Sequence, residues 1–161
     1  MESKEFKKEV SVILKSLGFK KYKSFWIRRG KEVSELVWLQ RSYYSRLYYF
    51  RYQYLINDLY IEDIVGGHVF AEPQLDRDYL EEIEQLCDLE NSIADDVRML
   101  KMREILNKAL EGKEKLVTTE SKLIGFILSC KGAFPSKPVI DYLKKKHPFI
   151  KPETWGIYKN W

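Results

Sequence analysis

The alternation of hydrophobic and polar side chains over residues 25–58 restricts the fold more than any other part of the sequence. It predicts three consecutive β-strands at 25–29, 32–43 and 47–57, because neighbouring side chains on a strand point to opposite faces. One face of the third strand carries Tyr48, Phe50, Tyr52, Tyr54 and Ile56. Since each aromatic side chain buries about 150–250 Å², this face is predicted to form one side of a hydrophobic core.

The strand at 32–43 is apolar on both faces, with Leu36 and Trp38 on one face and Val33, Val37 and Leu39 on the other. Such a strand is expected in the centre of a sheet. The reverse face of the third strand is mixed in character, with Leu47, Tyr49, Arg51, Gln53 and Leu55. A sheet that helices cover on only one side has this pattern.

Helices are predicted on either side of these strands from apolar residues three and four positions apart. The first begins with Ser3 as its cap, carries the stripe Phe6, Val10, Ile13, Leu14 and Leu17, and ends at Gly18. Gly30 is predicted to provide a positive φ in the turn between the first two strands. Gly66-Gly67 is predicted to be a turn, and residues 68–71 to form a short fourth strand before Pro73.

The second half of the sequence is predicted to be mainly helical. Residues 76–89 have helical spacing, although a strand ending at 86–88 is the alternative. Ser92 and Asp95 resemble a capping box that begins a helix running to Leu110, before Gly112. The buried side of this helix is predicted to be Val97, Leu100, Met102, Leu106, Ala109 and Leu110. A further helix is predicted to begin at Thr119 or Ser121 and to end at Gly132. The last helix is predicted to begin at Ser136, with Pro138 in its first turn.

These elements predict an α+β fold: an antiparallel sheet of about four strands after an N-terminal helix, with C-terminal helices packed on one face. A chain of 161 residues with 45% hydrophobic content is suited to one domain, 1–161, without disulfides or a metal. The two cysteines lack metal-ligand spacing, and neither a signal segment nor an apolar run of roughly 18 residues is present. We therefore expect a cytoplasmic protein.

Four short motifs in the first third to half of the chain have a distinctive order. They are Glu5-Phe6-Lys7-Lys8, Leu17-Gly18-Phe19-Lys20-Lys21, Phe25-Trp26-Ile27-Arg28-Arg29-Gly30 and Leu39-Gln40-Arg41-Ser42. This order resembles the bacterial family catalogued as domain of unknown function 4304. The resemblance implies an α+β fold and a bacterial origin, and it transfers no catalytic residue.

No constellation of residues in the sequence indicates catalysis, a metal or a cofactor. Each candidate has a simpler structural or surface interpretation: His68, His147, Cys87, Cys130, the acidic pairs Glu62/Asp63, Glu81/Glu82 and Asp95/Asp96, and the lysines 144–146. The histidines are far apart, the cysteines lack an activating context, and adjacent carboxylates point in different directions. The lysines complement a helix C-terminus. An enzyme remains possible only if the fold builds a pocket from residues distant in sequence.

One group of residues has the composition of a binding surface: Trp38, Gln40, Arg41, Tyr49, Arg51 and Gln53. Arginine and aromatic side chains are enriched where proteins bind each other. We therefore predict a non-enzymatic protein-binding module, immunity-like or regulatory. The alternative is single-stranded nucleic acid stacking on the same face; the formal charge of +4, from 28 basic and 24 acidic residues, permits but does not indicate this. In the structural interpretation, the aromatics cover the core and the arginines pair with acids.

Overall fold

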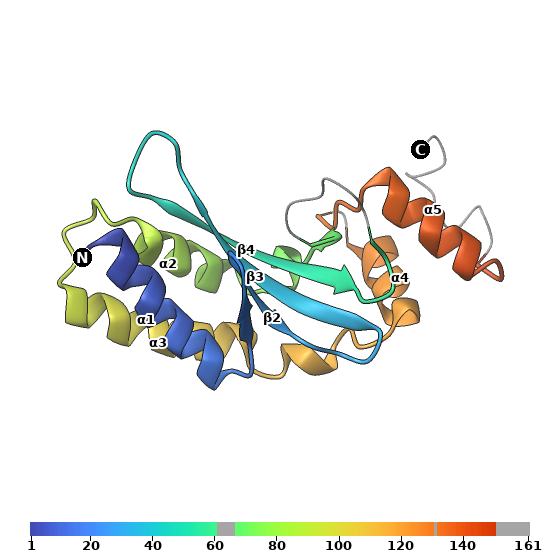
Figure 1. Cartoon of the computed structure of the whole chain (residues 1–161), viewed down its shortest axis with the longest axis horizontal. Helices are drawn as coiled ribbons and strands as arrows, with labels where there is room; N and C mark the ends of the chain where they lie inside the picture. The colour runs from blue at the N-terminus through green and yellow to red at the C-terminus, as the bar shows by residue number, and fades with distance from the viewer. Residues whose placement is uncertain (61–66, 131, 151–161) are drawn as a thin grey trace.

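The computed structural model describes residues 1–60, 67–130 and 132–150, which form the predicted α+β fold (Figure 1). Five antiparallel strands follow one another in a single sheet: β1 (Lys20–Tyr22), β2 (Phe25–Arg28), β3 (Val33–Arg41), β4 (Tyr48–Ile56) and β5 (Val69–Phe70). The helices are α1 (Ser3–Ser16), α2 (Arg77–Cys87), α3 (Asp95–Leu110), α4 (Glu120–Ser129) and α5 (Lys137–Lys146). Short 3-10 helices occupy Glu72–Gln74 and Lys113–Lys115.

The aromatic face of β4 lies in the core, as predicted. β3 and β4 pair along their full length, with Val33 opposite Ile56 and Arg41 opposite Tyr48. Every residue of the predicted core face of β4 is buried: Tyr48, Phe50, Tyr52, Tyr54 and Ile56. We call this side of the sheet the core face and the opposite side the outer face.

Helices from both halves of the chain pack on the core face. Phe6 of α1 stacks on Tyr48 with ring centroids 5.7 Å apart, and Phe126 of α4 meets Tyr54 edge-on at 5.6 Å. Figure 1 shows α1, α2 and α3 gathered at one end of the sheet and α4 and α5 at the other. Among the residues described, no helix has the length and apolar character needed to cross a membrane.

Three predicted local features are wrong. Gly30 does not have a positive φ; a side chain is excluded there because a Cβ would lie 1.9 Å from the Val33 carbonyl oxygen. Ser3 is the first residue of α1 rather than its cap, which is Glu2. Ser92 does not form a capping box, since α3 begins only at Asp95.

The buried side of α3 also differs from the prediction. Val97 and Leu100 are exposed, whereas Arg98 is buried. Arg98 donates hydrogen bonds to the carbonyl oxygens of Leu86 (2.6 Å), Asp88 (2.8 Å) and Asn91 (2.9 Å), so it satisfies the end of α2 and the following loop. A buried arginine thus belongs to the packed stripe, and the two apolar residues lie beside it.

The remaining predicted boundaries have mixed outcomes. Gly18 and Gly112 have positive φ angles of 88° and 73° after α1 and α3. Residues 76–89, for which the sequence allows a helix or a strand, contain the helix α2. Of the two candidate caps of α4, Thr119 is the cap and Ser121 is not. The strand β1 was not predicted, and it raises the number of strands from the predicted four to five. Gly66 of the predicted turn and residues 151–161 lie outside the described residues.

A charged contact joins the sheet to the ends of two helices. Arg28 of β2 forms a two-pronged ion pair with the buried Glu35 of β3, at 2.6 and 2.9 Å. The same guanidinium donates to the carbonyl oxygens of Leu17 after α1 and Leu110 at the end of α3, each at 3.1 Å. Arg28 therefore satisfies backbone acceptors that a helix C-terminus leaves without intrahelical donors.

Candidate binding patch on the outer face of the sheet

A row of large side chains crosses four strands on the outer face. The strand register places Tyr22 beside Phe25, Phe25 beside Trp38, and Trp38 beside Arg51. Directly paired residues of antiparallel strands have Cβ atoms about 4.5–5.5 Å apart. The row therefore forms a continuous strip of three aromatic rings and one guanidinium.

The next pair along β3 and β4, Gln40 and Tyr49, extends the row toward the hairpin. Arg51 donates a hydrogen bond from Nε to the Gln40 side-chain oxygen at 3.1 Å, and its guanidinium lies 5.3 Å from the Tyr49 ring centre. Phe25 meets Trp38 edge-on, with centroids 5.8 Å apart. These contacts restrict the side chains of the group that we call the outer patch: Tyr22, Phe25, Trp38, Gln40, Tyr49 and Arg51.

Two members of the outer patch are exposed to solvent. Tyr22 and Tyr49 are exposed, and the other four members are half-buried. Further along the same face, Ile27 and Leu36 are buried. A partner could therefore contact the part of the outer face near the β3–β4 hairpin, while the part beyond it is closed.

The structure brings together four of the six residues predicted as a site, Trp38, Gln40, Tyr49 and Arg51. Gln53 lies on the same face but is buried, and its side-chain oxygen accepts a hydrogen bond from the Gly67 amide at 2.6 Å. Arg41 pairs with Tyr48, so strand alternation assigns it to the core-face side. Arg41 is therefore outside the row of side chains on the outer face, although it lines the hollow at the base of the β3–β4 hairpin together with Trp38 and Gln40. The sequence alone does not give the strand register that separates it from the row.

Sequence reasoning missed Tyr22 and Phe25. The sequence places Phe25 on the first predicted strand but does not give the register that sets it beside Trp38. Tyr22 belongs to the short strand β1, whose pairs with β2 place it beside Phe25. The only signal for β1 was the change to a period of two after Phe19.

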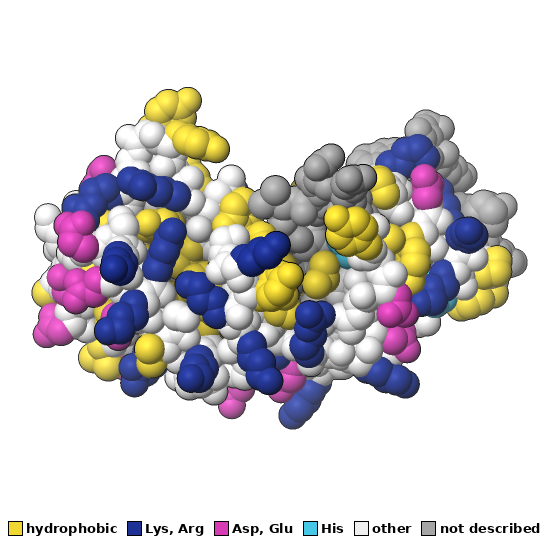
Figure 2. Space-filling view, viewed as in Figure 1, with side chains coloured by type: hydrophobic (Ala, Val, Ile, Leu, Met, Phe, Trp, Pro, Cys, Tyr) yellow, Lys and Arg dark blue, Asp and Glu magenta, His cyan; other side chains and the backbone are white. Residues whose placement is uncertain are grey.

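The hairpin between β3 and β4 projects beside the outer patch and carries two further tyrosines. Tyr43 and Tyr44 are 97% and 99% exposed. Figure 2 shows hydrophobic side chains at this projecting tip, at the upper left of the view. A hollow of about 750 Å³ at its base is lined by Trp38, Gln40, Arg41, residues 42–45, Arg46 and Glu90. The hairpin thus adds exposed aromatic area next to the patch.

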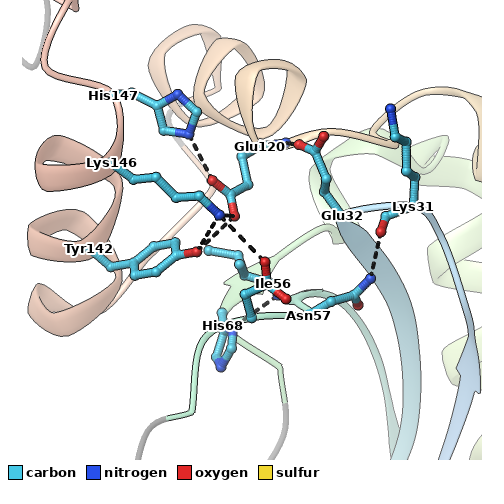
Figure 3. Close-up of polar contacts among 10 residues, drawn as sticks. Lys31, Glu32, Ile56, Asn57, His68, Glu120, Tyr142, Lys146 and His147 are labelled. Atoms are coloured by element: carbon cyan, nitrogen blue, oxygen red, sulfur yellow. Dashed lines mark hydrogen bonds and ion pairs between the residues drawn. The ribbon is translucent and has the colours of Figure 1, made fainter.

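A second polar cluster joins α5 to α4, to Glu32 before β3 and to Asp58 after β4 (Figure 3). One oxygen of Glu120 accepts hydrogen bonds from the Tyr142 hydroxyl at 2.9 Å and the Lys146 ammonium at 2.8 Å; the other lies 2.7 Å from His147 Nε2. The Glu120 amide donates to a carboxylate oxygen of Glu32 at 2.9 Å. Burial raises the pKa of Glu120, but the three donors outweigh it and lower that pKa below its ordinary value.

This cluster has the geometry of a structural anchor, because both oxygens of a buried carboxylate are already occupied. Lys146 also lies 3.6 Å from Asp58. The Lys146 side chain is 43% exposed, so this lysine faces solvent at the end of α5 and also pairs with two carboxylates, those of Asp58 and Glu120. We call Glu120, Tyr142, Lys146 and His147 the α5 anchor.

The other titratable candidates have structural surroundings. His68 is buried and its Nδ1 accepts a hydrogen bond from the Ile56 amide at 3.0 Å; burial lowers its pKa to about 4. Burial raises the pKa of the Cys87 thiol, and Cys130 is half-buried. Within the described ranges, no three His, Cys, Asp or Glu side chains gather as a metal site would require.

No protein-family model matches this sequence, and no curated protein or solved structure matches it either. The resemblance to the family of domain of unknown function 4304 therefore stays a prediction.

Proposed function

We propose that the protein is a bacterial, cytoplasmic binding module that recognises another protein through the outer patch, in an immunity-like or regulatory role. The observation that supports this is the row Tyr22, Phe25, Trp38 and Arg51 across four strands. Trp, Tyr and Arg dominate the energetically important positions of protein interfaces.

The contacts within the patch favour a protein partner because they limit the motion of its side chains. Arg51 is restricted by Gln40 and Tyr49, and Trp38 by Phe25. Ordering a flexible side chain on binding costs roughly 0.5–1.5 kcal/mol. A patch that is already ordered avoids much of this cost.

Single-stranded nucleic acid is the second candidate ligand of the outer patch, since bases stack on aromatic rings carried by sheets. Two contacts disfavour it. The Arg51 guanidinium already lies over Tyr49, and Phe25 and Trp38 meet at an interplanar angle of 72°, so these two rings do not form a flat platform. Tyr22 is the ring with the most accessible surface in the patch.

The decisive experiment is site-specific photocrosslinking in the native cells. A benzophenone amino acid at Tyr22 should trap one protein in a covalent complex that survives nuclease treatment and can be identified by mass spectrometry. The matched control position is Leu100, which is also exposed but lies on α3. We expect the crosslink at position 22, its loss on Arg51→Ala, and no equivalent product from position 100.

Two results would reject the proposal. The first is the same set of products from positions 22 and 100, which would indicate random collisions. The second is a product that disappears with nuclease, together with binding of a labelled single-stranded oligonucleotide that Tyr22→Ala abolishes; this would assign the outer patch to nucleic acid. Circular dichroism of each variant checks that the fold is retained.

A further inference from the structure

Five lysines line a groove between α1 and β1. The groove has a volume of about 420 Å³ and is lined by Lys4, Lys7, Lys8, Lys15 and Lys21 with Ser11 and Val12. No carboxylate lines it. Figure 2 shows Lys and Arg side chains gathered over this part of the molecule. We call it the lysine groove.

The sequence of α1 separates positive from negative charge around the helix axis. With 3.6 residues per turn, Lys4, Lys8 and Lys15 lie on one side of the helix, and the glutamates 5 and 9 lie on the flank away from Lys7. The buried stripe, Phe6, Val10, Ile13 and Leu14, takes the remaining side. Lys4 and Lys8 are four residues apart, a spacing at which like charges destabilise a helix. The positive charge of α1 is therefore concentrated on the side of the helix that faces the groove.

The ammonium groups of the groove are available to a ligand. In the part of the chain that the structure describes, none of the five forms an ion pair with a carboxylate. Two are positioned by aromatic rings: Lys7 Nζ lies 4.9 Å from the Tyr48 ring centre and Lys21 Nζ lies 4.9 Å from that of Trp26. Trp26 is itself held by a 2.9 Å hydrogen bond from its indole to Ser11.

We propose that the lysine groove binds the phosphate backbone of a nucleic acid. Lys4 and Lys15 are separated by about 16 Å along the helix at 1.5 Å per residue, so the groove is long enough to contact several phosphates of one strand. Lysine is a common phosphate contact. The inference does not depend on the outer patch, which is formed by other residues.

Two other polyanions suit the groove less well. Protein interfaces are depleted in lysine relative to the rest of the surface, so an acidic protein is not the expected ligand. A membrane surface favours an amphipathic face that inserts apolar side chains, whereas the lining contains one exposed apolar side chain, Val12, in a concave surface. Charge complementarity and shape together favour a nucleic-acid strand.

The test measures fluorescence anisotropy of labelled 20-nucleotide probes, one single-stranded oligothymidylate and one duplex, at 50–200 mM salt. Five phosphate contacts predict a slope of log K against log salt of about −3.5 for the single strand or −4.5 for the duplex. Over this range the affinity should fall roughly 100-fold or 500-fold, respectively. Strand preference follows from which probe binds more tightly at one salt concentration.

The variant pair is Lys8→Glu with Lys15→Glu, and the matched control is Lys122→Glu with Lys145→Glu. The control residues are exposed on α4 and α5, at the opposite end of the molecule (Figure 1). Each pair lowers the formal net charge of +4 by four units, two per substitution. We expect the groove pair to weaken binding more than 10-fold and the control pair less than twofold, with unchanged melting curves.

Several results would overturn the proposal. Equal losses in the two pairs would show attraction by net charge alone. Absence of binding to both probes at 50 mM salt would exclude a nucleic-acid site. Binding only to vesicles with anionic lipid, or only to polyglutamate, would assign the groove to a membrane or to an acidic protein. Loss of oligonucleotide binding on Arg51→Ala would place the site on the outer patch instead.

Discussion

Substituting Arg28 of β2 with methionine should strongly destabilise the protein. Methionine retains much of the side-chain length but removes the donors to Glu35, Leu17 and Leu110. The Glu35 side chain is only 5% exposed and would keep a hydrogen bond from the Tyr52 hydroxyl. Burial, with Tyr54 and Glu35 nearby, raises the pKa of Tyr52 well above its ordinary value, so the phenol remains a donor.

The magnitude follows from the partners that remain. Removing one member of a buried ion pair costs about 3–5 kcal/mol, because the other charge is left uncompensated. Two carbonyl oxygens at helix ends also lose a donor, although water can reach part of this site because the Arg28 side chain is 12% exposed. We therefore expect a loss of about 4 kcal/mol, a large share of the roughly 5–15 kcal/mol by which a domain is stable.

Urea unfolding at pH 7, followed by circular dichroism, measures this difference. The matched control is Arg29→Met, one residue further along at an exposed position, which should change the free energy of unfolding by less than about 0.5 kcal/mol. The pair Arg28→Met with Glu35→Leu should be less destabilised than the sum of the single variants. A loss below about 1 kcal/mol for Arg28→Met would refute the reasoning.

Three further variants test separate features. His68→Asn keeps an acceptor for the Ile56 amide but cannot titrate. The pKa of His68 is lowered from 6.5 to about 4, so between pH 7 and pH 4.5 the wild type should lose about 2–3 kcal/mol more stability than the variant. Glu120→Gln should cost about 1–3 kcal/mol at neutral pH. Because the Glu120 pKa is lowered, the contribution exists above its ordinary value of 4.5 and disappears as pH falls through the lower folded value, a trend that urea unfolding at several pH values measures. Gly30→Ala should cost about 1–3 kcal/mol in thermal or urea unfolding, since its Cβ would collide with the Val33 carbonyl.

Each of these variants has a contrary outcome that can be measured. Equal acid sensitivity of wild type and His68→Asn would show that His68 is protonated without cost. Hydrogen exchange in α5 should accelerate in Glu120→Gln, and unchanged exchange would contradict the α5 anchor. Gly125→Ala is the control for Gly30→Ala: a Cβ there meets nothing within 4 Å, so it should stabilise α4 by up to about 1 kcal/mol.

The sheet could be predicted because its signal is local. Alternation places Tyr52 and Tyr54 on one face without reference to any other segment, and burial of that face confirms it. The helix α3 shows the limit of this approach. Its apolar residues Val97 and Leu100 lie beside the packed stripe. Arg98 enters the stripe because carbonyl oxygens at the end of α2 and in the following loop accept its hydrogen bonds, and the spacing of residues within α3 does not reveal these partners.

Only part of the outer patch could be predicted from the sequence, because the residues that meet across strands depend on contacts between distant segments. Alternation identifies which residues share a face of one strand, but the register between strands decides which of them meet. It excludes Arg41 and adds Tyr22. The α5 anchor had no sequence signal, since Glu120 and its partners are 22 to 27 residues apart and no spacing rule connects them.

The contacts of Arg28 have a consequence for synthesis of the chain. Leu110 is translated 82 residues after the arginine that bonds to it. At about 5–20 residues per second this takes roughly 4–16 s. During that interval the tyrosine-rich core face of the emerging sheet lacks the helices that follow it in the chain, so a nascent chain at this stage should be a substrate for ribosome-associated chaperones.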